Sequence, residues 1–117
     1  MIKQYNKLVR DRIPAIIEQD GKTCETATLE ADDYETKLLE KLREETLELE
    51  QADSQHDKLE EIADAMEVLY ALTEYYGSTS EEVEQTRLKK RTERGGFSQR
   101  KLLKQVHDTG SKTLNET

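Results

Sequence analysis

The sequence has 117 residues, enough for one domain with a core but too few for two independent domains. Only 33% of the residues are hydrophobic and 38% are charged, so we expect a thin helical bundle or a helical oligomer that shares its core. The formal net charge of −8 disfavours a nucleic-acid polymer as partner, because binding to a phosphate backbone needs a basic face.

The sequence also argues against a membrane protein. No stretch approaches the length and apolarity of a membrane-spanning helix, and the first residues lack the apolar segment of a signal peptide. Cys24 is the only cysteine, so no internal disulfide can form. We therefore expect a soluble, cytoplasmic protein without a membrane partner.

Start and stop signals predict helices along most of the chain. Pro14 suits the first turn of a short helix that Gly21 ends, and the threonine-rich residues 22–29 lack helical period and predict a loop. Capping-box patterns beginning at Asp32, Asp57 and Ser78 open the longer helices. These are expected to span about 32–52, 57–76 and 78–94.

The fold class that follows is all-α. The short link DSQH makes the first two long helices an antiparallel hairpin, and the other helices complete a four-helix-bundle-like core. The helix from Asp57 is apolar over an arc too wide for one packed face, so we expect the core to be shared in a homodimer or larger assembly. Residues 1–106 are predicted to form a single domain, of which 98–106 are ambiguous in structure, and 107–117 a polar, frayed tail.

A carboxylate interrupts the apolar stripe of the first long helix. Glu45 occupies a position where a residue of period 3.6 would continue the stripe, and Glu48 lies at the edge of the stripe one turn later. Such breaks in patterning tend to mark function. The apolar members of this stripe are Tyr34, Leu38, Leu39, Leu42, Leu49 and Ala52.

The second long helix repeats the feature. Glu61 falls inside its apolar arc and Asp64 just beyond it, whereas Glu60, Glu67 and Glu74 lie on the opposite, solvated face. The main stripe consists of Leu59, Ile62, Ala63, Met66, Leu69, Tyr70 and Thr73, and it is extended by Ala65, Val68 and Leu72.

Two acidic pairs on neighbouring helices point to a cation site. Burying several unpaired carboxylates together is costly unless protons or cations relieve them, and ligands that are all oxygen suit Mg²⁺, or Mn²⁺, before Zn²⁺. The alternative is ordinary surface charge paired with Lys and Arg, and one such pair alone would favour it. Because both pairs interrupt an apolar stripe, we favour the metal site.

These residues carry a family resemblance. Glu44-Glu45-x-x-Glu48 followed by Glu61-x-x-Asp64 resembles the EExxE…ExxD signature of the MazG-type all-α nucleoside triphosphate pyrophosphatases. The segments YNKLVRDRIPAIIE and KKRTERGGF are similar to a branch of small bacterial and phage proteins described as phosphoribosyl-ATP pyrophosphohydrolase-like. Together these pieces extend from Tyr5 to about Phe97, so the domain is expected to be MazG-like.

The resemblance implies a magnesium-dependent reaction on a nucleoside triphosphate or related nucleotide. In the family, water attacks the α-phosphorus and a nucleoside monophosphate and pyrophosphate are released. Glu44 and Glu48 are the candidate catalytic carboxylates, although a plain solvated role for Glu44 is equally compatible with its position. The implied metal ligands are Glu45, Glu48, Glu61 and Asp64.

Cationic side chains are expected near a triphosphate. The family usually carries Lys and Arg on the helix after the acidic hairpin, which implicates Lys90 and Arg94, although cations there also offset the helix dipole. Lys7 and Arg10 are a second candidate group for substrate binding, or Arg10 and Asp11 pin the opening segment to a neighbouring helix through ion pairs. We expect the two histidines, His56 and His107, to be solvated and outside any cluster.

Three functions are compatible with these features. The first is a house-cleaning nucleoside triphosphate pyrophosphohydrolase. The second is phosphoribosyl-ATP hydrolysis in histidine biosynthesis, from whose dedicated enzymes the opening YNKLVRDRIP departs. The third is a non-catalytic helical dimerisation or regulatory module, and the intact set of four acids argues against it.

Overall fold

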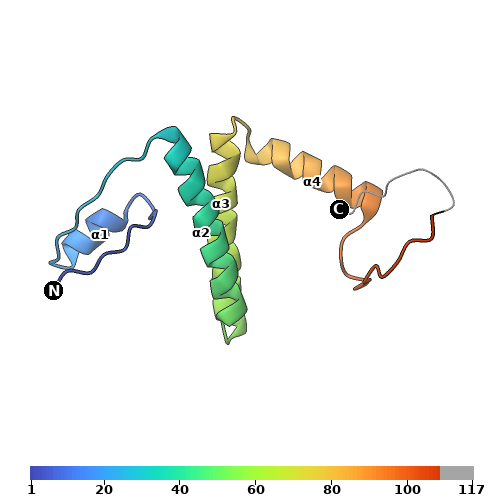
Figure 1. The fold of residues 1–117 in the computed structure, drawn as a ribbon, viewed down its shortest axis with the longest axis horizontal. Helices are drawn as coiled ribbons and strands as arrows, with labels where there is room; N and C mark the ends of the chain where they lie inside the picture. The colour runs from blue at the N-terminus through green and yellow to red at the C-terminus, as the bar shows by residue number, and fades with distance from the viewer. Residues whose placement is uncertain (109–117) are drawn as a thin grey trace. The chain divides into compact units, whose positions relative to one another are not determined.

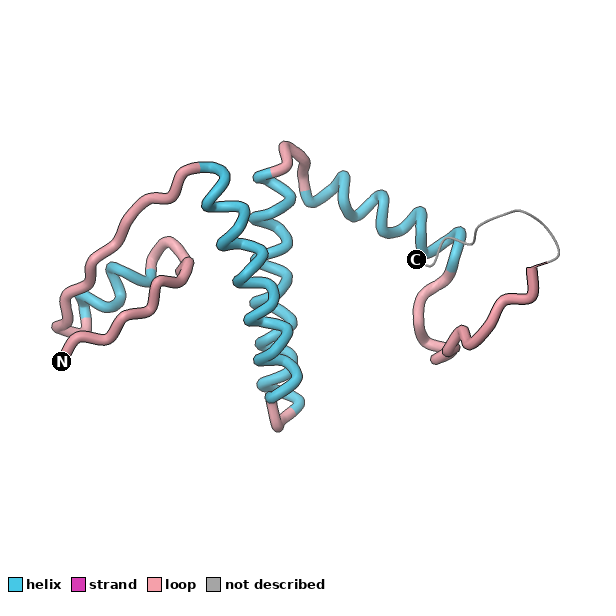
Figure 2. The backbone as a smooth tube through the Cα atoms, in the orientation of Figure 1, coloured by secondary structure: helices cyan, strands magenta, loops and turns pink. Residues whose placement is uncertain are grey.

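The computed structural model describes residues 1–108, and within that range the chain is all-α, with helices and no strand (Figure 2). The predicted fold class is confirmed. Most of the predicted tail, residues 109–117, lies outside the described residues. The helices are α1 (Ile13–Gln19), α2 (Ala31–Gln51), α3 (Gln55–Tyr75) and α4 (Ser80–Arg94).

The predicted hairpin is the centre of the fold. Helices α2 and α3 have 21 residues each, and they lie side by side and antiparallel on either side of a link formed by residues 52–54 (Figure 1). Leu38 from α2 and Val68 and Leu72 from α3 are buried between them. Partly buried side chains pack around this core, namely Leu8, Tyr34, Leu39, Leu42 and Ala71.

The helices begin at hydroxyl caps that differ from the predicted ones. The Ser54 hydroxyl accepts a hydrogen bond from the backbone N–H of Asp57 at 3.1 Å, so α3 starts at Gln55. In the same way the Thr79 hydroxyl accepts from the Glu82 N–H at 3.2 Å, and α4 starts at Ser80. Ser54 and Thr79 therefore cap the two helices, and the capping residues predicted at Asp57 and Ser78 are wrong.

Helix α2 begins without a side-chain cap, since Glu30 precedes it and makes no such bond. Asp32 and Asp33 lie in its first turn instead, where negative charge offsets the helix dipole. The predicted features before α2 are confirmed. Pro14 lies in the first turn of α1, Gly21 follows that helix with a φ of 82°, and residues 22–30 have no regular structure.

The chain divides into two compact units, Met1–Glu84 and the residues from Gln85 onward. The first contains the hairpin. In the second, α4 ends before Gly95, whose φ is 86°, and the Arg100 N–H donates to the Phe97 carbonyl at 3.0 Å in a turn. The ambiguous segment 98–106 contains no helix. The assignment of residues 1–106 to one domain stays a prediction.

Within the described chain, none of the helices combines the length and the apolarity needed to cross a membrane.

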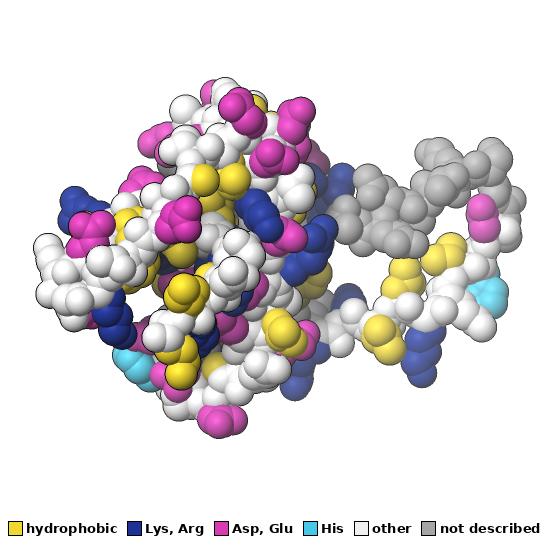
Figure 3. All heavy atoms as spheres, turned by 60° about the vertical axis from the view of Figure 1, so that its left-hand side comes forward, with side chains coloured by type: hydrophobic (Ala, Val, Ile, Leu, Met, Phe, Trp, Pro, Cys, Tyr) yellow, Lys and Arg dark blue, Asp and Glu magenta, His cyan; other side chains and the backbone are white. Residues whose placement is uncertain are grey.

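The centre of the wide apolar stripe on α3 faces away from α2. Val68 and Leu72, at the edge of the predicted arc, are the α3 residues buried against α2. Ile62, Met66 and Leu69 keep 44%, 45% and 47% of their surface exposed. Figure 3 shows hydrophobic side chains reaching the surface among charged ones. Among residues 1–108, nothing covers this apolar face of α3.

We predict that a second copy of the chain covers this face. Met66→Lys places a charge at its centre, where dimerisation would bury it without a partner, so the variant is expected to be monomeric. Sedimentation velocity at micromolar concentration measures the difference. Glu74→Lys, on the solvated side of α3, is the control and should leave the assembly unchanged. A well-folded wild-type monomer under these conditions contradicts the prediction.

Candidate metal centre

The hairpin buries one carboxyl group in the contact between its helices. Glu45 follows Leu38 and Leu42 along the inner face of α2, and only 5% of its surface is exposed. The prediction that Glu45 lies on the apolar face of this helix is therefore confirmed. A carboxylate on the inside of a helical hairpin is costly unless something compensates for its lost hydration.

Two acids from α3 meet Glu45. Glu45, Glu61 and Asp64 each offer one carboxylate oxygen, and these oxygens all lie within 4.8 Å of one another. Glu48 is exposed at the solvent edge, where it interacts with both Glu45 and Glu61. The structure thus brings the four predicted residues together, three of them as a tight group and Glu48 beside it.

Two oxygens inside this cluster lack a donor. No N–H or O–H group of the described protein reaches Glu45 Oε2 or Glu61 Oε2, and both atoms are buried. Lys41 Nζ approaches only the other oxygen, Glu45 Oε1, at 3.8 Å. A buried oxygen can be relieved by a proton shared between carboxyl groups or by a bound cation.

The electrostatics favour the shared proton in the metal-free protein. Burial raises the pKa of Glu45 to about 8, helped by hydrogen bonding to Glu61 and Glu48 and by the charge of Glu48, and opposed by Lys41. Hydrogen bonding from Glu45 lowers the pKa of Glu61, but burial and the neighbouring acids outweigh it, so that this pKa is also raised. At neutral pH the Glu45 carboxyl therefore keeps a proton that the neighbouring carboxylates can share.

The donor set fits a hard divalent cation. All ligand atoms are carboxylate oxygens from α2 and α3, with no sulfur or imidazole nitrogen among them. A cation at this place would satisfy the two buried oxygens and replace the shared proton. The residues present thus fit Mg²⁺ or Mn²⁺.

Glu44 lies beside the cluster and is held by two lysines. Its Oε1 is 3.2 Å from Lys7 Nζ and 3.7 Å from Lys41 Nζ, and a quarter of its side chain is exposed. The ion pairs keep its carboxylate at the border between the hairpin and solvent. A role for Glu44 as proton acceptor stays a prediction.

Arg10 reaches the cluster from the opening segment. Its Nη2 donates to Asp64 Oδ1 at 2.8 Å, and its Nη1 lies 4.0 Å from Glu67 Oε1. Glu67 is exposed, as predicted, but it also forms an ion pair with Arg10. The ion pair expected for Arg10 is therefore present, and Lys7 forms one with Glu44 that the sequence did not predict. Phosphate binding by Lys7 and Arg10 stays a prediction.

Lys90 and Arg94 belong to the second unit. Both are exposed on α4, and Arg91 and Arg94 lie in its last turn, where positive charge offsets the helix dipole. Their predicted contact with phosphate also stays a prediction.

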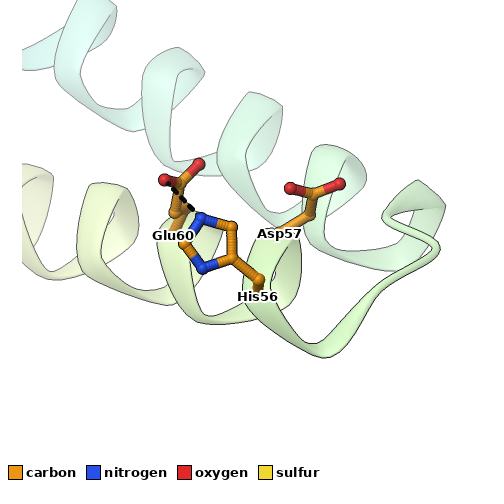
Figure 4. Close-up of side chains that lie close together, drawn as sticks. All are labelled: His56, Asp57 and Glu60. Carbon is orange, nitrogen blue, oxygen red and sulfur yellow. Dashed lines mark ion pairs between the residues drawn. The ribbon is translucent and has the colours of Figure 1, made fainter.

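A second group of possible ligands lies at the start of α3. His56 Nε2 is 3.1 Å from Glu60 Oε1, and Asp57 points to the same side (Figure 4). The expectation that His56 lies outside any cluster is wrong, because positions i and i+4 share a helix face. His107 is exposed as expected. The three residues of this group are exposed, and none of their oxygens is among the buried ones without a partner, so nothing there requires a cation.

Comparisons with known proteins add little to this geometry. No protein-family model matches the chain, and no solved structure matches it. An uncharacterized protein of Mycolicibacterium smegmatis is 46% identical over 54 residues, which cover 46% of this chain and 55% of that protein. The chain thus spans about half the length of this relative, and the comparison assigns no activity.

The shared proton predicts a pH dependence of stability in metal-free protein. The pKa of Glu45 is 4.5 when the group is unperturbed and about 8 in the fold, so the folded state holds the extra proton between these values. Stability is then fully present below pH 4.5 and is lost as the pH rises through about 8. The loss is on the order of a few kcal/mol.

Thermal unfolding in EDTA between pH 5 and 9 measures this effect. Glu45→Gln removes the titrating group and is expected to flatten the profile, whereas Glu50→Gln, exposed on the same helix, should keep the wild-type slope. Parallel profiles for wild type and Glu45→Gln would show that no raised pKa exists at this position.

Proposed function

We propose that the chain is a Mg²⁺-dependent nucleoside triphosphate pyrophosphohydrolase, which releases pyrophosphate and a nucleoside monophosphate. The observation that carries the proposal is the buried Glu45 carboxyl, whose free oxygen faces further acids from the neighbouring helix. A hairpin selected only for stability has no reason to bury a carboxyl there, because an apolar side chain would pack at lower cost.

The resemblance described above supports the same assignment. Three of the five acids in its EExxE…ExxD signature form the cluster, and Glu48 adjoins it. In this proposal Glu45, Glu61 and Asp64 hold the ion, and Glu48 completes the set from the solvent edge. A bound Mg²⁺ supplies charge neutralisation for the phosphates and lowers the pKa of water nearby.

The remaining steps fall to side chains of the chain itself. In this proposal Glu44, which shares Lys41 with Glu45, and Glu48, which interacts with Glu45 and Glu61, are the acceptors for the proton of the attacking water. Lys7 and Arg10, already in contact with the acids, and Lys90 and Arg94 on α4 are the proposed phosphate ligands. A house-cleaning role in the cytoplasm remains part of this proposal.

Phosphoribosyl-ATP hydrolysis and a non-catalytic dimerisation module are the competing functions. Release of pyrophosphate with Mg²⁺ across a panel of nucleotides, phosphoribosyl-ATP included, distinguishes them. A preference for canonical or damaged nucleoside triphosphates supports the proposal, a preference for phosphoribosyl-ATP assigns the biosynthetic reaction, and no release with any compound favours the module.

The metal site predicts the effect of Glu61→Gln. The substitution keeps shape and removes a charge from the proposed shell, so kcat/KM should fall by about two orders of magnitude or more. Metal-free stability should hold or rise, because one repelling charge leaves the hairpin interior. A coupled assay of pyrophosphate release and a thermal melt in EDTA measure the two effects.

Glu74→Gln is the matched control for Glu61→Gln. It makes the same change on the same helix at an exposed position, whereas Glu67 contacts Arg10 and is less suitable. The control should alter neither activity nor stability by more than about 0.5 kcal/mol. Equal activity of the Glu61 and Glu74 variants at saturating Mg²⁺ contradicts the metal site.

Metal binding is also predicted to release a proton. The ion replaces the proton on Glu45, whose pKa is about 8, so affinity for Mg²⁺ should rise as the pH increases from 6.5 toward about 8. Calorimetry in two buffers of different ionisation enthalpy counts the protons released. The His56→Gln variant should behave like wild type, which separates the buried site from the exposed group at the start of α3. Affinity independent of pH would contradict ligation by Glu45.

A further inference from the structure

The opening segment lies on the acidic hairpin through contacts that are distant in sequence. Leu8 packs against the core, and the Asn6 carbonyl accepts a hydrogen bond from Lys37 Nζ at 3.4 Å. Lys7 pairs with Glu44, so this part of the segment is fixed to α2 by one apolar and two polar contacts.

Beyond this anchored stretch, Arg10 reaches across to α3 and pairs with Asp64. The same Asp64 is one of the three acids whose oxygens converge within 4.8 Å. The guanidinium thus occupies one member of the cluster from outside, while the buried oxygens of Glu45 and Glu61 remain without a donor. Arg10 and a divalent cation bound to this group would be neighbours of like charge.

We propose that Arg10 is an exchangeable counter-ion. It holds Asp64 in the metal-free protein, yields Asp64 to the divalent cation, and then binds the phosphate groups of the nucleotide that the cation brings. This inference rests on the proposed function. It adds an order of events, in which Arg10 first pairs with Asp64 and then binds the phosphate groups of the substrate.

The pair is suited to exchange because it is weak. Arg10 keeps 55% of its side chain exposed and Asp64 40%, and ion pairs with this exposure contribute about 0–1 kcal/mol. A divalent cation in the carboxylate cluster offers Asp64 a stronger partner and repels the guanidinium. The opening segment does not leave, because Leu8 and Lys7 have contacts of their own on α2.

An arginine released from Asp64 is a cationic hydrogen-bond donor close to the cluster, which is the kind of group that binds phosphate. Its planar guanidinium can bind two phosphate oxygens at once, and the anchored segment keeps it within reach of the cation site. An arginine serving only to pin the segment would stay on Asp64 whether or not a ligand is bound, and this difference can be measured.

The test compares Arg10→Gln with wild type in two titrations that need no turnover. In the first, calorimetry with Mg²⁺ alone should show about twofold to fivefold tighter binding in the variant, because the competing ion pair is gone. In the second, inorganic tripolyphosphate at saturating Mg²⁺ should bind about tenfold or more weakly, because a charge-assisted contact to phosphate is lost.

Arg12→Gln is the matched control. It removes the same charge from the same segment, and Arg12 makes no side-chain cap bond at the start of α1. It should change both affinities by less than about twofold, the range of ordinary surface substitutions. Equal effects of the two variants would reduce the result to general electrostatics and overturn the proposal.

Each further outcome also decides. Unchanged or weaker Mg²⁺ binding in Arg10→Gln, with the helical circular dichroism intact, overturns the exchange, as does unchanged tripolyphosphate binding. If wild type itself binds no Mg²⁺, the proposed function fails before the arginine is tested. If wild type binds Mg²⁺ but Arg10→Gln shows neither tighter Mg²⁺ binding nor weaker tripolyphosphate binding, the metal site stands and the exchange alone is wrong.

Discussion

The compensation of one buried carboxyl, that of Glu45, governs the rest of this structure. The hairpin core is small, with Leu38, Val68 and Leu72 as its buried apolar residues, so a polar group in the same contact weighs heavily. Replacing lost hydration requires a proton, a cation or a basic side chain, and the neighbourhood of Glu45 contains acids that can share a proton and one basic side chain, Lys41. The stability of the hairpin therefore depends on the protonation of these acids.

The metal-free chain neutralises its acids from within. Lys41 on α2 contacts both Glu44 and Glu45, and the opening segment adds Lys7 and Arg10. These cations contact the outer oxygens of the cluster, and Glu45 Oε2 and Glu61 Oε2 have no hydrogen-bond partner. The surrounding cations thus shield the outside of the cluster and not these two buried oxygens.

Start and stop signals predicted the helices and helical period predicted the position of Glu45, because each depends on neighbours within a few residues. The start of α3 was misjudged, since the Ser54 hydroxyl lies before the region in which the period is visible. The apolar arc on α3 is so wide that the sequence could not show which of its edges packs on α2. In the structure Val68 and Leu72 are buried, whereas Ile62 and Met66 are exposed. The ion pair of Arg10 joins residues 54 positions apart, and no local pattern encodes it.

That separation also bears on how the chain folds. The hairpin closes across a link of only residues 52–54, so its contacts are local and form early. Lys7 and Arg10 meet their partners 37 and 54 residues away, which places the docking of the opening segment late. During folding the acids therefore converge with Lys41 already beside Glu44 and Glu45, and the cations of the opening segment join them later.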